Sequence, residues 1–451
     1  MRTRVAIVLG VMLALVVMTG QEVRAQTKKF PSGTTVTILA SSSHTQLNGV
    51  FDSVGEIEKA QGIKVVVVKA PVVEIVPKTA RDIQLGSGQF DVIDFTDQGI
   101  LNLHDLFEPL DARLKGDNTN IDQWKTQFAP WLKDTFVFNG QIKYWPYYLT
   151  AIGGMYRKSL LEDPKEKAAF KQKLGYDLPT PPKTPKELTD VAVFFTRKTG
   201  GQELYGLTMP GSGNPAVDIF HMHLFKAGLP GVFDEKGNLL WGKNHPENKE
   251  VVLKVAQHLY NLANGVKVTP PGIAAMSTTE NLKFYLDGKA AMLFDLIHNG
   301  WKDVTSQAVI SRLGETASFE VPGHKPNEGG IVFYWHWAMS KSSKNKDAAW
   351  EVMKWLNTDK TLRLALTGGI GVFVPSHTAT AQWAAQQKLL PPAVVSQVAN
   401  GKPYRVPKAW SVYYATVARE QISKLTGGTI TPEEFVKVTA DEGDRVAEEN
   451  R

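Results

Sequence analysis

The sequence contains no cysteine in its 451 residues. A disulfide framework is therefore excluded, and so is a lipid anchor attached through a cysteine. Apart from a shorter run near the N-terminus, no stretch approaches the roughly 18 apolar residues of a membrane-spanning helix. Basic residues are not interleaved with aromatic ones as in a nucleic-acid site, and the net charge is only +6. These absences predict a soluble globular protein that does not bind nucleic acid.

The N-terminal segment has the three parts of a secretory signal. Arg2 and Arg4 precede an apolar run from Val5 to Val17, and Val23 and Ala25 occupy the −3 and −1 places of a cleavage site. We therefore expect residues 1–25 to form a signal peptide that is removed on export. The mature protein is then expected to be free in the bacterial periplasm, with no lipid anchor.

Strand and helix patterns alternate over the first part of the mature chain. Runs rich in β-branched and aromatic residues at 34–40, 63–70 and 90–97 predict strands, and helical patterns separate them. Buried strands linked by helices predict a parallel α/β sheet. Ligands of such sheets lie beyond the carboxyl ends of the strands. The candidate site residues at these predicted ends are Ser42, Ser43, His44 and Asp97.

Three extended segments interrupt the later, more helical part of the chain. The first, at 140–158, contains Pro146 and the Gly153–Gly154 pair, which would let the backbone bend. The chain is long enough for two or three compact units, and we expect it to pass between two lobes three times. The predicted division places 26–148 with 330–376 in lobe 1 and 149–329 with 377–451 in lobe 2, with hinges near 147–152, 322–332 and 371–379.

A family resemblance rests on the order of several stretches rather than on one motif. They include "EIEKAQGIKVVVV", "GQFDVIDF", "NGQIKYWPYYLTAIGGMYRKSLLE", "YLDGKAAMLFD", "SKSSKNKDAAWEVMKWLN" and "GGTITPEEF". Over nearly all of the mature chain, this order resembles the extracellular solute-binding proteins of ABC importers, sugar-binding group. The resemblance implies a class II-like periplasmic-binding-protein fold, in which two α/β lobes joined by crossing segments close on a solute. It also implies delivery of that solute to membrane permease subunits, without catalysis or a cofactor.

The sequence departs from the family pattern at two places that concern the expected cleft. After "AAMLF", Asp295 keeps the acidic place, but His298 stands where the family often has a tryptophan, and Trp301 follows three residues later. The first crossing has Tyr147 and Tyr148 where maltose-binding relatives carry a carboxylate. These departures predict a cleft that is more aromatic and less acidic than one built for maltose.

Aromatic residues gather in the run from Phe333 to Trp337. In a strand, Trp335 and Trp337 share one face and His336 lies on the other, so either Trp335 or His336 reaches the cleft. The family register favours Trp335, and aromatic faces suit the apolar faces of sugars. Trp145 and Trp410 are further candidates near a predicted crossing and a helix start. The predicted ligand-binding set is therefore Ser42, Ser43, His44, Asp97, Trp145, Tyr148, Asp295, Trp301, Trp335 and Trp410.

Competing site chemistries have weaker support in the sequence. His221 and His223 are two apart, so they would not share a helix face as metal ligands. Asp91 and Asp94 would point to opposite faces of a strand, which favours sheet-end roles over a glycosidase pair. We predict no catalytic residue, no metal and no cofactor, which disfavours a secreted hydrolase. The predicted function is a monomeric binding protein for a carbohydrate or polyol, and the alternative is another small organic solute, possibly an aromatic one.

Overall fold

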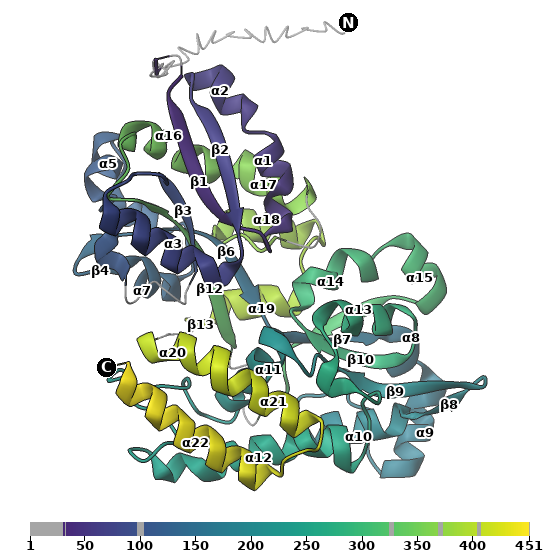
Figure 1. Cartoon of the computed structure of the whole chain (residues 1–451). Coiled ribbons are helices and arrows are strands. Elements are labelled where there is room, and N and C mark those ends of the chain that lie inside the picture. Colours follow the sequence, from purple (N-terminus) through teal and green to yellow (C-terminus); the bar gives the residue numbers. More distant parts are fainter. Residues whose placement is uncertain are drawn as a thin grey trace, which may run out of the picture.

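The computed structural model contains two main β-sheets, each covered by helices and joined by extended chain (Figure 1). A small two-stranded sheet of β4 (Val137–Phe138) and β5 (Gln141–Ile142) accompanies them. None of the helices in the described part of the chain is long and apolar enough to cross a membrane. The predicted signal peptide lies outside the described residues. The structure describes residues 30–31, 33–96, 103–323, 329–368, 373–403 and 407–450.

The first sheet occupies the upper part of Figure 1 and has the order β13-β12-β3-β1-β2, with β6 paired to β12. β1 pairs in parallel with both β2 and β3, as the β-branched runs predict. Its strands are β1 (Thr35–Ser41), β2 (Lys64–Ala70), β3 (Val92–Thr96), β6 (Trp145–Ala151), β12 (Ile331–Met339) and β13 (Lys402–Pro403). Nearby helices are α1 (Asn48–Asp52), α2 (Gly55–Gln61), α3 (Val72–Leu85), α5 (Asp111–Gly116), α16 (Lys346–Leu356), α17 (Asp359–Gly368) and α18 (Thr378–Gln386).

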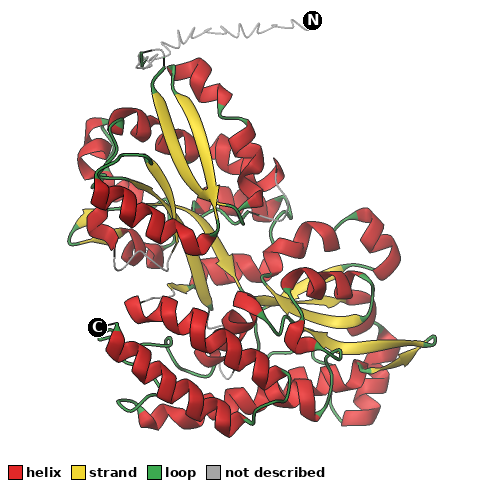
Figure 2. Cartoon of the chain, in the orientation of Figure 1, coloured by secondary structure: helices red, strands yellow, loops and turns green. Residues whose placement is uncertain are grey.

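The second sheet has the order β11-β7-β10-β9-β8 and lies among the helices of the lower part (Figure 2). Its strands are β7 (Gly153–Arg157), β8 (Arg197–Thr199), β9 (Gln202–Thr208), β10 (Ala290–Asp295) and β11 (Thr316–Phe319). Its helices include α8 (Lys158–Leu161), α9 (Pro164–Leu174), α10 (Pro185–Phe195), α11 (Gly213–Lys226), α12 (Lys249–Tyr260), α13 (Thr278–Leu286), α14 (Ile297–Val304), α15 (Gln307–Leu313), α20 (Lys408–Tyr413), α21 (Arg419–Thr426) and α22 (Pro432–Glu449).

A single extended segment belongs to both sheets. β6 pairs antiparallel with β12 in the first sheet, and the chain continues through Ile152 into β7, which pairs with β10 and β11 in the second. The segment before α18 also joins β6, because the Leu149 amide donates to the Val374 carbonyl at 2.9 Å. Helix α19 (Pro392–Asn400) lies against β6, β11 and β12. The junction is therefore made mainly of paired strands.

The glycine pair after β6 has a different role from the predicted bend. Gly153 and Gly154 lie in the extended strand β7, and a Cβ atom on Gly154 would meet the Phe319 ring at 2.3 Å. Glycine is therefore required by close packing rather than by a turn. Helix α22 begins with a capping box: the Thr431 hydroxyl accepts a hydrogen bond from the Glu434 amide, and the Glu434 carboxylate accepts one from the Thr431 amide.

Candidate ligand-binding cavity

A cavity of about 390 Å³ lies between the two sheets. One wall comes from the first sheet and its loops, and the other comes from helices that cover the second sheet. Residues after β10 form a third side. Its lining residues include Ser43, His44, Thr96, Tyr148, Phe333 and Trp335 from the first wall, Asn214, Asp218, Trp410, Tyr414 and Arg419 from the second, and Leu296, His298 and Asn299 from the third.

The first wall begins at the carboxyl ends of parallel strands, where the sequence places polar residues. Ser43 and His44 follow β1, and Thr96 is the last residue of β3. Because β1 and β3 are parallel neighbours, their ends meet at one edge of the sheet. The predicted residues Ser43 and His44 therefore line the cavity.

Three buried polar side chains form a hydrogen-bonded chain behind this wall. His44 Nδ1 lies 2.8 Å from Asp94 Oδ2, and the Tyr147 hydroxyl donates to Asp94 Oδ1 at 2.6 Å. The Ser41 amide also donates to Asp94 Oδ2, at 3.0 Å. Burial, and after it the Asp94 charge, raise the pKa of Tyr147 well above its ordinary value. The phenol therefore stays protonated and remains a donor.

A bulge in β6 brings two consecutive tyrosines toward His44. Trp335 of β12 lies opposite Tyr148, but the next residue, His336, lies opposite Pro146. Tyr147 is thus the extra residue of the bulge. Its hydroxyl lies 3.1 Å from His44 Nδ1, and the Tyr148 ring lies edge-on to His44 with centroids 5.2 Å apart.

The structure resolves the alternation that the sequence left open in the aromatic run. Trp335 lines the cavity, and its ring meets His44 edge-on with centroids 4.0 Å apart. His336 is fully buried on the other face, with Nε2 3.0 Å from the Thr135 hydroxyl. Burial lowers the pKa of His336 to about 3, so this imidazole is neutral.

The second wall is held by a polar cluster on α11 and on the helices near the C-terminus. The Tyr414 hydroxyl shares its single hydrogen between Asp218 Oδ1 at 2.8 Å and the Asn214 carbonyl at 3.0 Å. The Arg419 guanidinium donates to the Asn214 side chain. Residues five apart in an α-helix point about 140° away from each other. Here a π turn, η7 (Tyr414–Ala418), closes over five residues and lets Tyr414 and Arg419 face the same cavity.

Four predicted site residues do not line this cavity: Ser42, Trp145, Trp301 and Asp295. Ser42 is exposed, and its amide donates to the Ala70 carbonyl. Trp145 is core, edge-on to Trp124 with centroids 5.4 Å apart. The Trp301 indole donates to the Lys388 carbonyl.

Asp295 lies beneath the surface at the end of β10. It accepts hydrogen bonds from Asn281 at 2.8 Å and from the Leu296 amide at 2.7 Å. Burial raises its pKa to about 6. It ties β10 to α13 instead of lining the cavity. The remaining predicted residue, Asp97, lies outside the described residues.

Sequence reasoning missed most of the second wall. Asn214, Asp218 and Arg419 line the cavity because of how α11 and α21 pack, and the sequence offered no motif for either helix position. Tyr414 depends on the π turn, which no residue pattern announced. His298 is one of the departures from the family pattern, and its Nε2 lies 3.2 Å from the Tyr148 hydroxyl.

Comparisons with known proteins agree with this architecture. The chain is similar in fold to maltose-bound MalE3 of T. maritima (18% identity, TM-score 0.71), covering 92% of this chain and 100% of that one. The GacH receptor of Streptomyces glaucescens, solved unliganded and with acarbose, gives 19% identity, TM-score 0.70 and coverages of 92% and 99%. An ABC transporter solute-binding protein of Agrobacterium vitis with bound D-mannitol is 20% identical, with a TM-score of 0.68. The match covers 92% of this chain and 98% of that one. Residues 41–363 match the family described as bacterial extracellular solute-binding protein. The chain therefore belongs to the bacterial extracellular solute-binding protein family.

Proposed function

We propose that this protein is the substrate-binding component of an ABC transporter, which captures a carbohydrate or polyol in the cavity and delivers it to permease subunits. The observation that carries the proposal is the mixed lining of the cavity, in which rings such as Trp335 and Trp410 stand beside Asn214, Asp218 and Asn299. Apolar ring faces suit the C–H faces of a sugar, while polar groups orient its hydroxyls. Similar folds were solved with maltose and D-mannitol bound.

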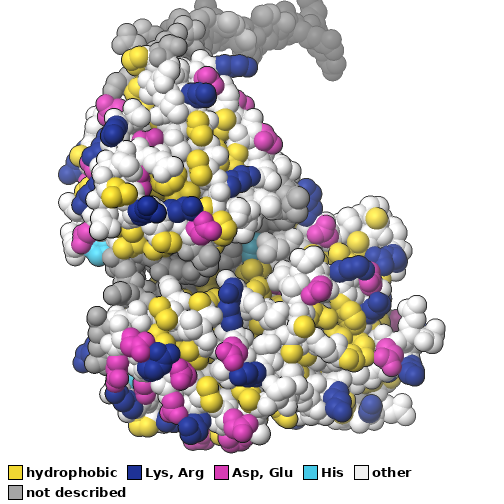
Figure 3. Space-filling model, viewed as in Figure 1, with side chains coloured by type: hydrophobic (Ala, Val, Ile, Leu, Met, Phe, Trp, Pro, Cys, Tyr) yellow, Lys and Arg dark blue, Asp and Glu magenta, His cyan; other side chains and the backbone are white. Residues whose placement is uncertain are grey.

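The proposed role is binding without catalysis. The His44–Asp94 pair would need a nucleophile at the other imidazole nitrogen to act as a hydrolase. Within the described ranges, that nitrogen has no hydrogen-bond partner. Lys and Arg side chains are interspersed with Asp and Glu on the face shown in Figure 3, which disfavours nucleic-acid binding at that face. We further propose a monomer, exported by cleavage after Ala25 and free in the periplasm without a lipid anchor.

We propose that the two sheets belong to lobes that move about the paired strands between them. Lobe 1 would comprise 26–148 and 330–376, and lobe 2 would comprise 149–329 and 377–451, with hinges near 147–152, 322–332 and 371–379. α18 falls in lobe 2 by this division, yet it packs on α17, a helix of lobe 1. We therefore place α18 with lobe 1 and treat α19, which lies against strands of both sheets, as part of the junction.

A thermal-shift panel of maltose, D-mannitol, ribitol and benzyl alcohol tests the function. A sugar or polyol at 100 times its Kd should stabilise the protein by about 2.7 kcal/mol and raise the melting temperature. Chromatography of the recovered solute should show it unchanged. A shift with benzyl alcohol alone would favour the aromatic-solute alternative, which the ring-rich wall makes worth testing. A consumed solute would contradict the non-catalytic role.

A further inference from the structure

The buried chain of Tyr147, Asp94 and His44 has a consequence for solute choice. We propose that Asp94 and Tyr147 hold His44 in a single neutral tautomer, whose Nε2 atom accepts a hydrogen bond from a solute hydroxyl. The inference deepens the proposed function and rests on it. Asp94 and Tyr147 are positioning residues in this scheme, and His44 is the residue that contacts the solute.

The hydrogen bonds to Asp94 indicate that Nδ1 of His44 carries a proton. A carboxylate can only accept hydrogen bonds, and Asp94 receives the Ser41 amide and the Tyr147 hydroxyl at 3.0 and 2.6 Å. Its third contact, with His44 Nδ1 at 2.8 Å, must then be donated by the imidazole. Because the Tyr147 hydrogen is already used, its oxygen, 3.1 Å from Nδ1, cannot donate to Nδ1 and can only accept from it, which also requires a proton on Nδ1.

In the neutral ring that we propose, the opposite nitrogen is an acceptor. In a neutral imidazole protonated at Nδ1, Nε2 carries a lone pair and no hydrogen. His44 lines the cavity, and the structure gives its Nε2 no partner among the residues that it describes. Edge-on contacts from Trp335 and Tyr148 hold the ring plane in place. The site therefore favours a solute with a free hydroxyl donor at this position.

His298 provides a contrast within the same cavity. Burial lowers the pKa of His298 to about 3, so its ring is neutral, but its Nε2 already lies 3.2 Å from the Tyr148 hydroxyl. That contact joins a residue after β10 to β6 and makes His298 part of the cavity frame. His44 instead has its Nδ1 paired behind the wall, which leaves Nε2 to the solute.

Nitrogen-15 NMR of the solute-free protein tests the tautomer directly. His44→Gln assigns the His44 signals, and we expect a protonated Nδ1 and an unprotonated Nε2. Asp94→Leu should move the proton toward Nε2, because Nδ1 loses its carboxylate acceptor and the freed Tyr147 hydroxyl, 3.1 Å away, can donate to Nδ1. Tyr147→Phe keeps the Asp94 acceptor and should leave the proton on Nδ1, and it serves as the second variant if Asp94→Leu fails to fold. A doubly protonated ring, or an Nε2–H tautomer in the wild type, would overturn the proposal.

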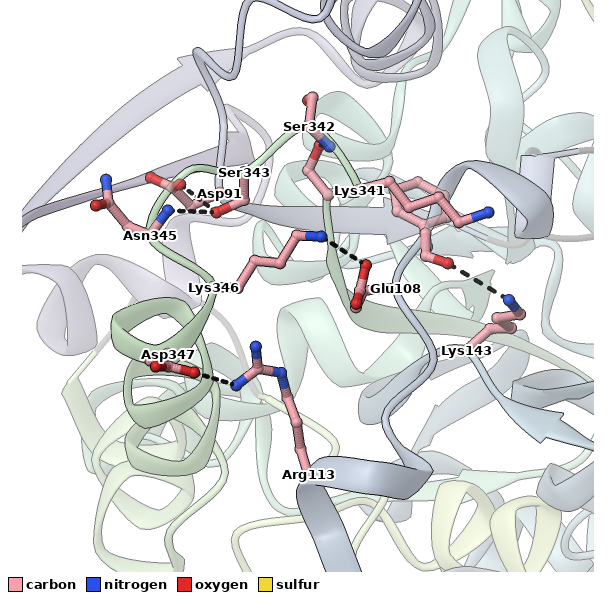
Figure 4. Close-up of polar contacts among 12 residues, drawn as sticks. Asp91, Glu108, Arg113, Lys143, Lys341, Ser342, Ser343, Asn345, Lys346 and Asp347 are labelled. Carbon is pink, nitrogen blue, oxygen red and sulfur yellow. Dashed lines mark hydrogen bonds and ion pairs between the residues drawn. The ribbon is translucent and has the colours of Figure 1, made fainter. Parts of the chain in front are cut away.

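Asp91 supplies a matched control on the same segment. Like Asp94 it is buried, and it accepts the Thr37 amide at 2.8 Å and the Ser343 hydroxyl at 2.6 Å (Figure 4). Burial raises the pKa of Asp91, and no histidine contact with it is present in the described structure. Asp91→Asn should therefore leave the His44 signals and solute affinity at wild-type values.

Solute analogues test whether His44 selects a solute that has a hydroxyl donor. The probe is the tightest binder among maltose, D-mannitol and ribitol, with its monodeoxy and monodeoxyfluoro derivatives. For one hydroxyl of the solute, the deoxy and the fluoro derivative should both bind roughly 10- to 100-fold more weakly than the parent solute, because neither can donate to Nε2. In Asp94→Leu the fluoro derivative should regain affinity relative to the deoxy one, since Nε2–H can donate to fluorine. An unchanged ranking would contradict selection by His44. If no probe binds, the proposed function fails, while the NMR result still decides the tautomer.

Discussion

Trp335 is the residue whose replacement best separates ligand binding from stability. Its half-buried ring lines the cavity, so Trp335→Ala removes an apolar face that we expect the solute to cover. Solute affinity should fall by about 2 to 4 kcal/mol, or roughly 30- to 1,000-fold. Trp350→Ala is the control, because Trp350 is buried and donates to Asp117 at 2.7 Å away from the cavity. It should cost about 3 to 5 kcal/mol of stability and leave the affinity of the folded protein unchanged. Calorimetric titration beside thermal melting separates these outcomes.

Asp295 should make the stability of the protein depend on pH. Burial raises its folded-state pKa to about 6, above the value near 4 of an unfolded chain. Below pH 4 both states are protonated. As the pH rises from 4 through 6, Asp295 ionises in the unfolded state before it ionises in the folded state. This difference lowers the free energy of unfolding by about 3 kcal/mol. This stability is present at low pH and is lost above pH 6.

Urea unfolding at pH 4 and pH 7 measures this loss. Asp295→Asn should flatten the pH dependence relative to the wild type. Asp122→Asn is the control, because the Asp122 side chain is 97% exposed and should leave the dependence unchanged. Parallel curves for the wild type and Asp295→Asn would show that burial does not penalise the Asp295 charge.

At the scale of elements, β7 needs glycine at position 154, because the Phe319 ring of β11 occupies the space of a side chain there. Gly154→Ala would push a methyl group into the Phe319 ring of β11 and should cost about 1 to 3 kcal/mol in urea unfolding. In Gly116→Ala the added Cβ atom has no atom within 4 Å, so this replacement should change stability by less than about 1 kcal/mol. Phe319→Leu combined with Gly154→Ala should recover part of the loss. Equal costs for both glycine replacements would refute the packing explanation.

Local patterns predicted the elements better than their junctions. β1, β2 and β3 follow runs of β-branched and aromatic residues, and the cap before α22 follows a Thr-x-x-Glu spacing. The bulge in β6 and the π turn at Tyr414–Ala418 could not be predicted, because each is imposed by the packing of the neighbouring strand or helix. Trp145 is a candidate only through its place near the predicted crossing, and the structure packs it in the core against Trp124 and Trp350.

At the scale of the whole molecule, the first wall of the cavity was predictable and the second was not. Ser43 and His44 follow from the edge of a parallel sheet, since that edge is fixed by topology. Asn214 and Asp218 lie on a helix whose orientation depends on contacts far away in sequence. Family order therefore predicted the fold, and only part of the site.

Closure of the proposed lobes should change the overall size of the protein. Rotation about the segment that runs from β6 into β7 would bring the two walls of the cavity together on a bound solute. Small-angle X-ray scattering should record a smaller radius of gyration at a saturating concentration of the solute identified by the thermal-shift panel. The same radius with and without that solute would indicate a molecule that does not close.

The central claim is that a carbohydrate or polyol binds between the two sheets, in contact with both walls. A crystal structure of the protein grown with the tightest-binding solute tests it most directly. The account predicts solute density in the cavity, with the ring of Trp335 against an apolar face and a hydroxyl within hydrogen-bond distance of His44 Nε2. Full solute occupancy elsewhere on the protein, with this cavity holding only water, would contradict the account.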